Sequence, residues 1–176
     1  MINGYLSIGS NLGSRNINIK KAIFELSKID SFNILSVSSI YETKPMYYLK
    51  QNNFLNIAIL YLTNLDPFIL LDQIQNIEKI LGRPVKRLKY SERIIDIDII
   101  TYGNEIIHNN RLHIPHKLLE ERLFVLIPIN EIDKNFILPL SRIKISTLIK
   151  KIDNKNDVKL YKVINLSYAQ AISYSN

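Results

Sequence analysis

Two aspartates placed one residue apart, Asp96 and Asp98, are the clearest sign of chemistry in this sequence. In a β-strand, residues i and i+2 project from the same face about 6.6 Å apart, while the isoleucines between and beside them (Ile95, Ile97 and Ile99) point into a core. Like charges on one face of a strand repel, so the pair needs a counter-charge. Mg²⁺ supplies one, because it prefers carboxylate oxygens together with substrate phosphates. The pair therefore predicts a Mg²⁺ site, with a solvated polar face at a sheet edge as the alternative.

A basic segment stands directly before the two aspartates. Its five cations are Arg83, Lys86, Arg87, Lys89 and Arg93. Arginine and lysine neutralise phosphate groups, and arginine does so with a planar fork of donors. Each of these residues taken alone is more often part of a solvated surface than of a binding site. Together with the carboxylates that follow, they predict a polyphosphate held on Mg²⁺.

Other polar residues carry weaker signals. His116 follows Ile114-Pro115, and a lone histidine is more often structural than catalytic. Gln75 and Glu78 lie off the apolar stripe of a predicted helix, so by themselves they indicate an exposed helix face.

Composition narrows the class of protein. The 176 residues include no cysteine, which excludes disulfides and thiolate metal sites, and 47% of them are hydrophobic. The net charge of +7 favours a polyanionic partner, although AT-rich codons for lysine, isoleucine, asparagine and tyrosine explain it equally well. The sequence begins without a signal-peptide pattern and has no apolar run of about 20 residues, so we expect a cytoplasmic protein with no membrane partner.

The elements that must position these residues form one α+β pattern. Strands are predicted over 4–9, 33–43, 54–63 and 94–101, with a strand-like run at 158–166. Helices are predicted from Arg15, from Asp66-Pro67 to Gly82, near 116–123 and near 145–152. Because only two substantial helices separate the strands, we expect a mostly antiparallel sheet with helices packed on it.

Six segments, in this order, resemble the 6-hydroxymethyl-7,8-dihydropterin pyrophosphokinase family, and the resemblance runs from about residue 4 to residue 139. The segments are Ser7-Ile-Gly-Ser-Asn-Leu-Gly13, Ser38-Ser-Ile-Tyr-Glu-Thr43-Lys-Pro45 with Phe54-Leu-Asn56, Ile77-Glu78-Lys-Ile-Leu-Gly82-Arg83, Arg93-Ile-Ile-Asp96-Ile-Asp98, Ile114-Pro115-His116, and Glu121-Arg122-Leu-Phe124 with Pro128-Ile-Asn-Glu131.

The resemblance implies a fold and a reaction. The fold is a ferredoxin-like α+β core, with residues 1–155 as the pyrophosphokinase domain and 156–176 as a C-terminal extension of unknown role. The reaction moves the β,γ-diphosphate of ATP to the pterin hydroxymethyl group and releases AMP, in folate biosynthesis. The partners are then ATP, the pterin and two Mg²⁺ ions, with no nucleic acid, and the protein is a monomer.

The resemblance also implies residue roles. Asp96 and Asp98 would bind the two Mg²⁺ ions and act in catalysis with Arg83 and Arg93. The ATP site would consist of Leu71, Gln75, Glu78, Arg83, Arg93, Ile99 and His116. The pterin site would consist of Thr43, Met46, Phe54, Asn56 and Phe124, with the two phenylalanines stacking on the ring.

The chain departs from the family pattern just before Arg93. Ser91-Glu92 replaces a Gly-Pro pair, and Tyr90 stands where tryptophan is frequent. Glu92 places an anion beside Arg93, which would weaken ATP binding or change how the segment closes.

Two other classes stay open at this point. Another DxD-type Mg²⁺-dependent nucleotidyl or glycosyl transferase would need a different acceptor site, and Phe54, Asn56 and Phe124 would then be core residues only. A basic RNA-binding ferredoxin-like domain would need aromatic residues in a basic central strand, whereas the strand at 94–101 carries acids.

Overall fold

The computed structural model describes residues 1–45, 51–84, 91–153, 157–164 and 167. Its elements, in chain order, are β1 (Ile2–Ser10), α1 (Arg15–Ser27), β2 (Phe32–Val37), β3 (Ile40–Thr43), β4 (Phe54–Thr63), α2 (Pro67–Ile80), β5 (Asp96–Ile99), β6 (Ile107–His108), β7 (His113–Ile114), the 3-10 helix η1 (Leu119–Glu121), α3 (Leu123–Ile132), α4 (Ile145–Lys151) and β8 (Val158–Lys162). Among these helices, none has the length and apolar character needed to cross a membrane.

The main sheet is antiparallel and confirms the predicted α+β class. Its strand order is β5-β1-β4-β3-β8, and β2 also pairs with β4. If β2 and β3 count as one interrupted strand, the chain from β1 to β5 is a β-α-β-β-α-β unit of the ferredoxin-like type. The second pairing partner of β1 therefore comes from residues about 90 positions later in the chain.

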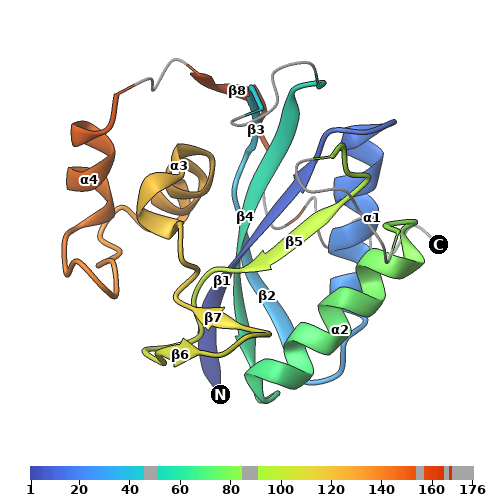
Figure 1. Cartoon of the computed structure of the whole chain (residues 1–176), viewed down its shortest axis with the longest axis horizontal. Coiled ribbons are helices and arrows are strands. Elements are labelled where there is room, and N and C mark those ends of the chain that lie inside the picture. The colour runs from blue at the N-terminus through green and yellow to red at the C-terminus, as the bar shows by residue number, and fades with distance from the viewer. Residues whose placement is uncertain (46–50, 85–90, 154–156, 165–166, 168–176) are drawn as a thin grey trace.

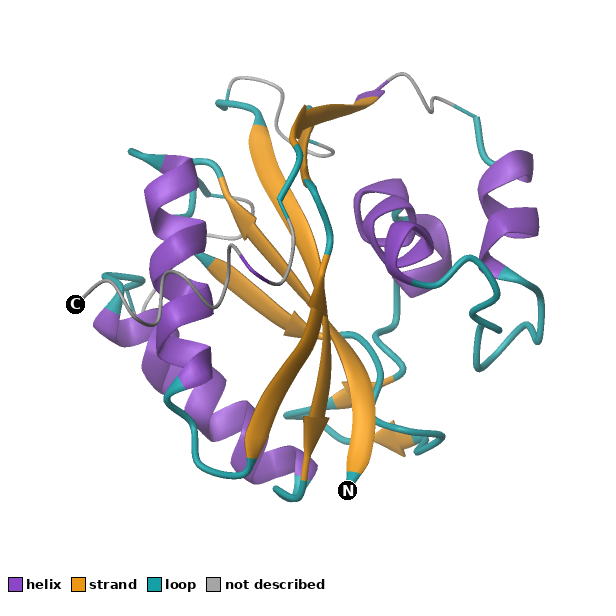
Figure 2. Cartoon of the chain, turned by 180° about the vertical axis from the view of Figure 1, so that it is seen from behind, coloured by secondary structure: helices purple, strands orange, loops and turns teal. Residues whose placement is uncertain are grey.

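Helices cover both faces of this sheet (Figures 1 and 2): α1 and α2 lie on one face, and α3 lies on the other, with α4 packed on the outer side of α3. Alternation along each strand fills the two layers. Leu6 and Ile8 of β1, like Ile97 of β5, belong to the core under α1 and α2. Tyr5 points to the opposite side, into a smaller core with residues of α3 and α4.

Both ends of α2 lie where the sequence predicts them. The Asp66 carboxylate accepts hydrogen bonds from the N–H groups of Phe68 and Ile69, and Pro67 occupies the first turn. The helix ends before Gly82, whose φ of +94° is in the left-handed region that favours glycine.

The predicted strand 33–43 is wrong as a single element, because two serines interrupt it. The Ser38 hydroxyl accepts a hydrogen bond from the Ala58 N–H at 2.9 Å. The next N–H, that of Ser39, goes to the carboxylate of Glu131 at 3.0 Å. These contacts divert the backbone from regular pairing with β4 and separate β2 from β3.

Three other predictions need correction in extent. The strand predicted over 94–101 is regular only over Asp96–Ile99; the N–H groups of Ile100 and Thr101 both approach the Tyr5 carbonyl instead. The short helix predicted near 116–123 is the single turn η1, and α3 begins directly after it. The tail contributes Val158–Lys162 to the sheet beside β3, so part of the expected extension is an edge strand of the main fold.

Candidate functional site

A cleft opens on the α3 side of the sheet, beyond the first turn of that helix. It encloses about 790 Å³ of empty space, including part of the solvent at its mouth. Its lining comes from β1, β3, β4, β5 and the segments beside them: Ser7, Gly9, Thr43, Lys44, Pro45, Gln51, Phe54, Asn56, Ser91, Arg93, Asp96, Asp98, Arg122 and Phe124.

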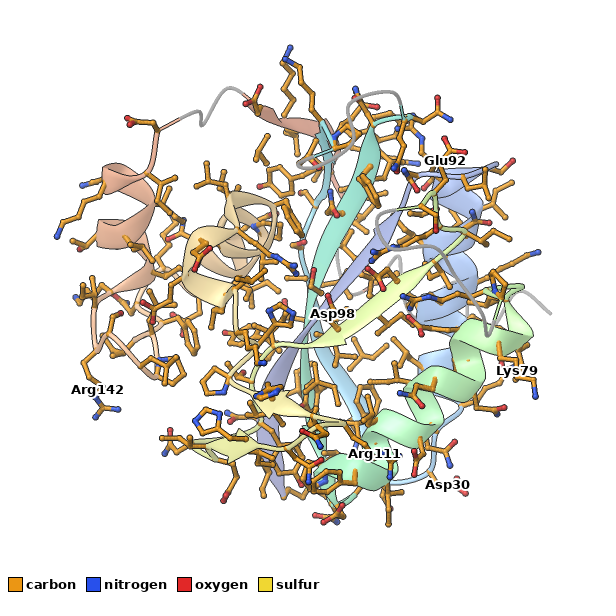
Figure 3. The ribbon with its side chains drawn as sticks, viewed as in Figure 1. Asp30, Lys79, Glu92, Asp98, Arg111 and Arg142 are labelled. Carbon is orange, nitrogen blue, oxygen red and sulfur yellow. The ribbon has the colours of Figure 1, made fainter. Side chains whose placement is uncertain are left out.

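The paired aspartates lie on one face of β5, as predicted, and both line this cleft. Asp96 lies opposite Gly9 and Asp98 opposite Ser7 in the β1–β5 ladder. Ile97 is buried on the other face of β5. Figure 3 shows Asp98 on β5. A Cβ at Gly9 would come within 3.0 Å of the Asn56 Oδ1, so glycine keeps the floor of the cleft open between the acids and β4.

Asp96 has arginine partners. Its carboxylate contacts Arg83 at 2.5 Å and also Arg93. Arg83 makes a second ion pair with Glu78, and the side chains of both are about one-tenth exposed. Within the part of the chain that the structure describes, the like charges of the DxD pair are therefore offset by arginines as well as by any bound cation.

Asp98 faces a different cation, one that the sequence reasoning did not assign. Its Oδ2 lies 3.8 Å from the Arg122 guanidinium and 4.0 Å from the Nε2 of His116. The Arg122 guanidinium also lies 5.6 Å from the ring centre of Phe124. The sequence offered one indication of a role for Arg122: this cation lies two residues before Phe124, in a segment that carries the family resemblance.

His116 is held as a neutral imidazole. Burial, and then the nearby Arg122 charge, lower the pKa of His116 to about 4. Its Nδ1 accepts the Leu118 N–H at 3.2 Å, which favours the proton of the neutral ring on Nε2. Nε2 lies 4.0 Å from the Asp98 Oδ2 and 3.4 Å from the Nη1 of Arg122, so a carboxylate and a guanidinium both stand beside it.

The predicted pterin residues gather at the other end of the cleft. Phe54, Asn56, Thr43 and Phe124 all line it. Asn56 is buried, and its amide donates to the Thr43 hydroxyl at 2.8 Å, which fixes the direction of both side chains. Met46, the fifth predicted pterin residue, lies outside the described residues.

The remaining predicted ATP residues lie away from this cleft. Leu71 packs against the core that contains Ile99, on the face of β5 opposite the aspartates. Gln75 is exposed, as predicted. The expectation of an exposed Glu78 is wrong: its carboxylate is buried and accepts the Ile97 N–H at 2.7 Å, because Arg83 supplies the counter-charge.

Asn11 holds the C-terminal end of the basic segment. No role was assigned from the sequence to this residue of the Ser7–Gly13 segment. The Asn11 Oδ1 accepts the Arg93 N–H at 2.7 Å, and the Asn11 N–H donates to the Arg93 carbonyl at 3.0 Å. Glu92, where the family has proline, lies 3.3 Å from the side-chain nitrogen of Asn52. Lys86, Arg87, Lys89 and Tyr90 lie outside the described residues.

The residues present fit a magnesium site completed by a ligand. In the described residues no group of three or more histidines and acids gathers around one point. Two carboxylates on one cleft wall match Mg²⁺ bound by one or two acids plus substrate phosphates, whereas a dedicated protein cage would need more oxygen ligands.

Comparison with known proteins points in one direction. The family described as 7,8-dihydro-6-hydroxymethylpterin-pyrophosphokinase (HPPK) matches residues 5–134. A Haemophilus influenzae protein named 2-amino-4-hydroxy-6-hydroxymethyldihydropteridine pyrophosphokinase is 38% identical over 160 residues, which are 91% of this chain and 99% of the relative. A Bacillus subtilis protein of the same name is 41% identical over 128 residues, 73% of this chain and 76% of the relative.

Solved structures agree on the fold. The structure of Plasmodium falciparum HPPK-DHPS A437G superposes with a TM-score of 0.72 at 16% identity, over 90% of this chain and 48% of that chain. This chain thus spans about half of the larger protein, and at that identity the likeness concerns the fold alone.

Proposed function

The chain belongs to the 7,8-dihydro-6-hydroxymethylpterin-pyrophosphokinase family, and on that premise we propose that the cleft beside α3 is its active site. The enzyme transfers the β,γ-diphosphate of ATP to 6-hydroxymethyl-7,8-dihydropterin and releases AMP, in folate biosynthesis. Family membership favours this activity over a DxD transferase of another kind and over an RNA-binding domain. One observation carries the site: paired carboxylates and a buried, aromatic-flanked Asn56 face the same cavity.

The phosphate end of the site is the wall formed by β5. Asp96 and Asp98 would hold two Mg²⁺ ions, which, when bound, neutralise the phosphates and align them for transfer. Arg93 lines the cleft beside them, and Arg122 adds a cation next to Asp98. His116 would donate from Nε2 to a phosphate oxygen. Arg83 would act from behind Asp96, through the ion pair that orients it.

The pterin end is the wall formed by β3, β4 and the start of α3. Phe54 and Phe124 would stack on the two faces of the flat ring. Asn56, oriented by Thr43, would read the hydrogen-bonding edge. Met46 completes this group in the proposal.

The nucleoside end of ATP is assigned to the α2 side of β5. Leu71, Gln75, Glu78 and Ile99 are proposed to line it. The support is that α2 packs on β5, where the Glu78 carboxylate reaches the backbone of the metal-binding strand. This places the base beyond the phosphates and away from the pterin.

The chemistry is a displacement at phosphorus. The pterin hydroxyl oxygen attacks the β-phosphorus, the bond from that phosphorus to the oxygen bridging to the α-phosphate breaks, and AMP leaves with that oxygen. The hydroxyl proton passes to solvent. The residues position the two substrates and stabilise negative charge on the phosphate oxygens, which are the main contributions expected for such transfers.

The product of the reaction tests the proposed function directly. With Mg²⁺, ATP and 6-hydroxymethyl-7,8-dihydropterin, we expect one AMP for each pterin diphosphate, measured by ³¹P NMR and chromatography. Omission of the pterin should remove AMP formation. Appearance of ADP in place of AMP would refute attack at the β-phosphorus.

Loss of either stacking ring should weaken pterin binding selectively. We expect Phe54→Ala and Phe124→Ala each to cost about 1–3 kcal/mol of pterin binding free energy, the magnitude of base–aromatic stacking. Calorimetry with the pterin, and separately with a non-hydrolysable ATP analogue, gives the comparison. Phe24→Ala, on α1 outside the cleft, is the matched control, and equal loss of both ligands in the cleft variants would indicate a collapsed core.

Three further features belong to the proposal. We infer a cytoplasmic monomer without a nucleic-acid partner, since the cleft accounts for the basic side chains nearest to it. The division into residues 1–155 and an extension 156–176 is also proposed, with β8 as the part of the extension that joins the sheet. Sedimentation of the purified chain tests the oligomeric state.

A further inference from the structure

The carboxylate of Glu131 joins α3 to the sheet through three hydrogen bonds. It accepts the Ser39 N–H at 3.0 Å, the Ser39 hydroxyl at 2.8 Å and the Tyr41 hydroxyl at 2.9 Å. All three donors belong to β3 or to the break just before it. A charged acceptor that serves three donors makes a strong local attachment, because hydrogen bonds to ionised groups exceed neutral ones in strength.

Each end of this attachment leads to a residue of the cleft. On the helix, Glu131 lies seven positions after Phe124, which is two turns, so both side chains lie on the same face of α3. On the strand, Ser39, Tyr41 and Thr43 alternate onto one face. Thr43 is the partner of Asn56. The Glu131 contact therefore connects α3, which carries Phe124, to β3, whose Thr43 orients Asn56.

Helix α3 lacks one of its own backbone hydrogen bonds, so contacts with the sheet matter more for its position. Pro128 lies inside α3 and has no N–H, so the carbonyl of Phe124 loses its intrahelical partner. Burial and the neighbouring Glu131 raise the pKa of Tyr41 above its ordinary value, so the phenol stays protonated as a donor.

We propose that Glu131 is a positioning residue for the pterin pocket, setting the separation of Phe124 from Thr43 and Asn56 through α3 and β3. This inference rests on the proposed function of the cleft. Glu131 itself is not among the residues that line the cavity, so its effect is indirect. It should act on the pterin more than on the nucleotide, because Asp96, Asp98 and Arg93 of the phosphate end lie on β5 or just before it, and Arg122 is the member of that end that lies at the start of α3.

The test compares Glu131→Gln and Tyr41→Phe with a matched control. Glutamine keeps the shape but removes the negative charge that the three donors share, and its NH₂ group replaces the oxygen that accepts the Ser39 hydroxyl. Tyr41→Phe removes a single hydrogen bond and keeps the ring. Glu120→Gln is the control, because Glu120 accepts the Ser141 N–H at 3.1 Å without touching β3.

For Glu131→Gln we expect about a tenfold weaker pterin Kd in the presence of Mg²⁺ and a non-hydrolysable ATP analogue, and about threefold for Tyr41→Phe. The KM for ATP and the analogue Kd should change less than twofold, and Glu120→Gln should match the wild type. If Glu131→Gln fails to fold, Tyr41→Phe decides the question.

Two outcomes would overturn the inference: pterin affinity unchanged in the variants, or pterin and nucleotide affinity lost in parallel, which is what general loosening produces. A wild-type protein that binds no pterin would instead contradict the proposed function itself. The wild-type titration thus separates the two failures.

Discussion

Replacement of Asp98 by alanine should abolish turnover without unfolding the protein. Asp98 supplies one of two carboxylates proposed for Mg²⁺, and loss of several kcal/mol of transition-state stabilisation lowers the rate at least about a thousandfold. Its side chain is 38% exposed, and among the described residues Arg122 and His116 lie 3.8 and 4.0 Å from its Oδ2, so loss of this solvent-screened carboxylate should cost little stability. Steady-state AMP formation and the thermal midpoint without Mg²⁺ are the two measurements.

Two other aspartates complete this experiment: Asp96 as the comparison and Asp30 as the control. Asp96→Ala should abolish turnover equally but also destabilise the protein by about 1–3 kcal/mol, because charge-assisted contacts to Arg83 and Arg93 are lost. Asp30→Ala, on the exposed turn after α1 (Figure 3), should change neither property. Full activity of Asp98→Ala would remove this acid from the metal site.

Replacement of Arg83 by methionine should produce a large loss of stability. Arg83 lies between two carboxylates, and its removal leaves the buried Glu78 without its cation and close to the Asp96 charge. Breaking a buried ion pair by removal of one partner costs about 3–5 kcal/mol, a large part of the stability of a domain. Urea unfolding measures the loss, and activity should fall with it because Asp96 loses its support.

A second substitution makes the Arg83 experiment decisive. Glu78→Gln removes the unpaired charge and keeps an oxygen that can accept the Ile97 N–H. The double variant should therefore be more stable than Arg83→Met alone. Losses that simply add would mean that the two side chains do not interact energetically. Arg83→Lys should retain the charge and lose the fork that reaches both acids.

Local patterns in the sequence were sufficient where local chemistry decides the structure. The Asp66-Pro67 start and the Gly82 end of α2 follow from capping and backbone preference, and β4 begins and ends at the predicted residues. The common face of Asp96 and Asp98 follows from the two-residue period of a strand. Each of these depends on residues within a few positions of one another.

Features set by distant partners were not predictable in the same way. The break between β2 and β3 depends on Glu131, which is 92 positions away from Ser39. Burial of Glu78 depends on a contact with the backbone of β5, and the position of Arg122 beside Asp98 depends on how η1 and α3 meet the sheet. From the sequence, Glu78 was expected to be exposed because it is charged, and Glu131 and Arg122 were given no role.

The carboxylate of Glu78 has one more consequence, for association between molecules. β5 lies at an edge of the main sheet, paired only with β1 among the described strands. An edge strand presents backbone donors to which a strand of another molecule can add, which is a common start of aggregation. Here the Ile97 N–H is already bonded to Glu78, and α2 lies alongside. β5, which carries both aspartates, can therefore lie at the edge of the sheet, where substrates reach it. Its Ile97 N–H is not available to pair with a strand of another molecule.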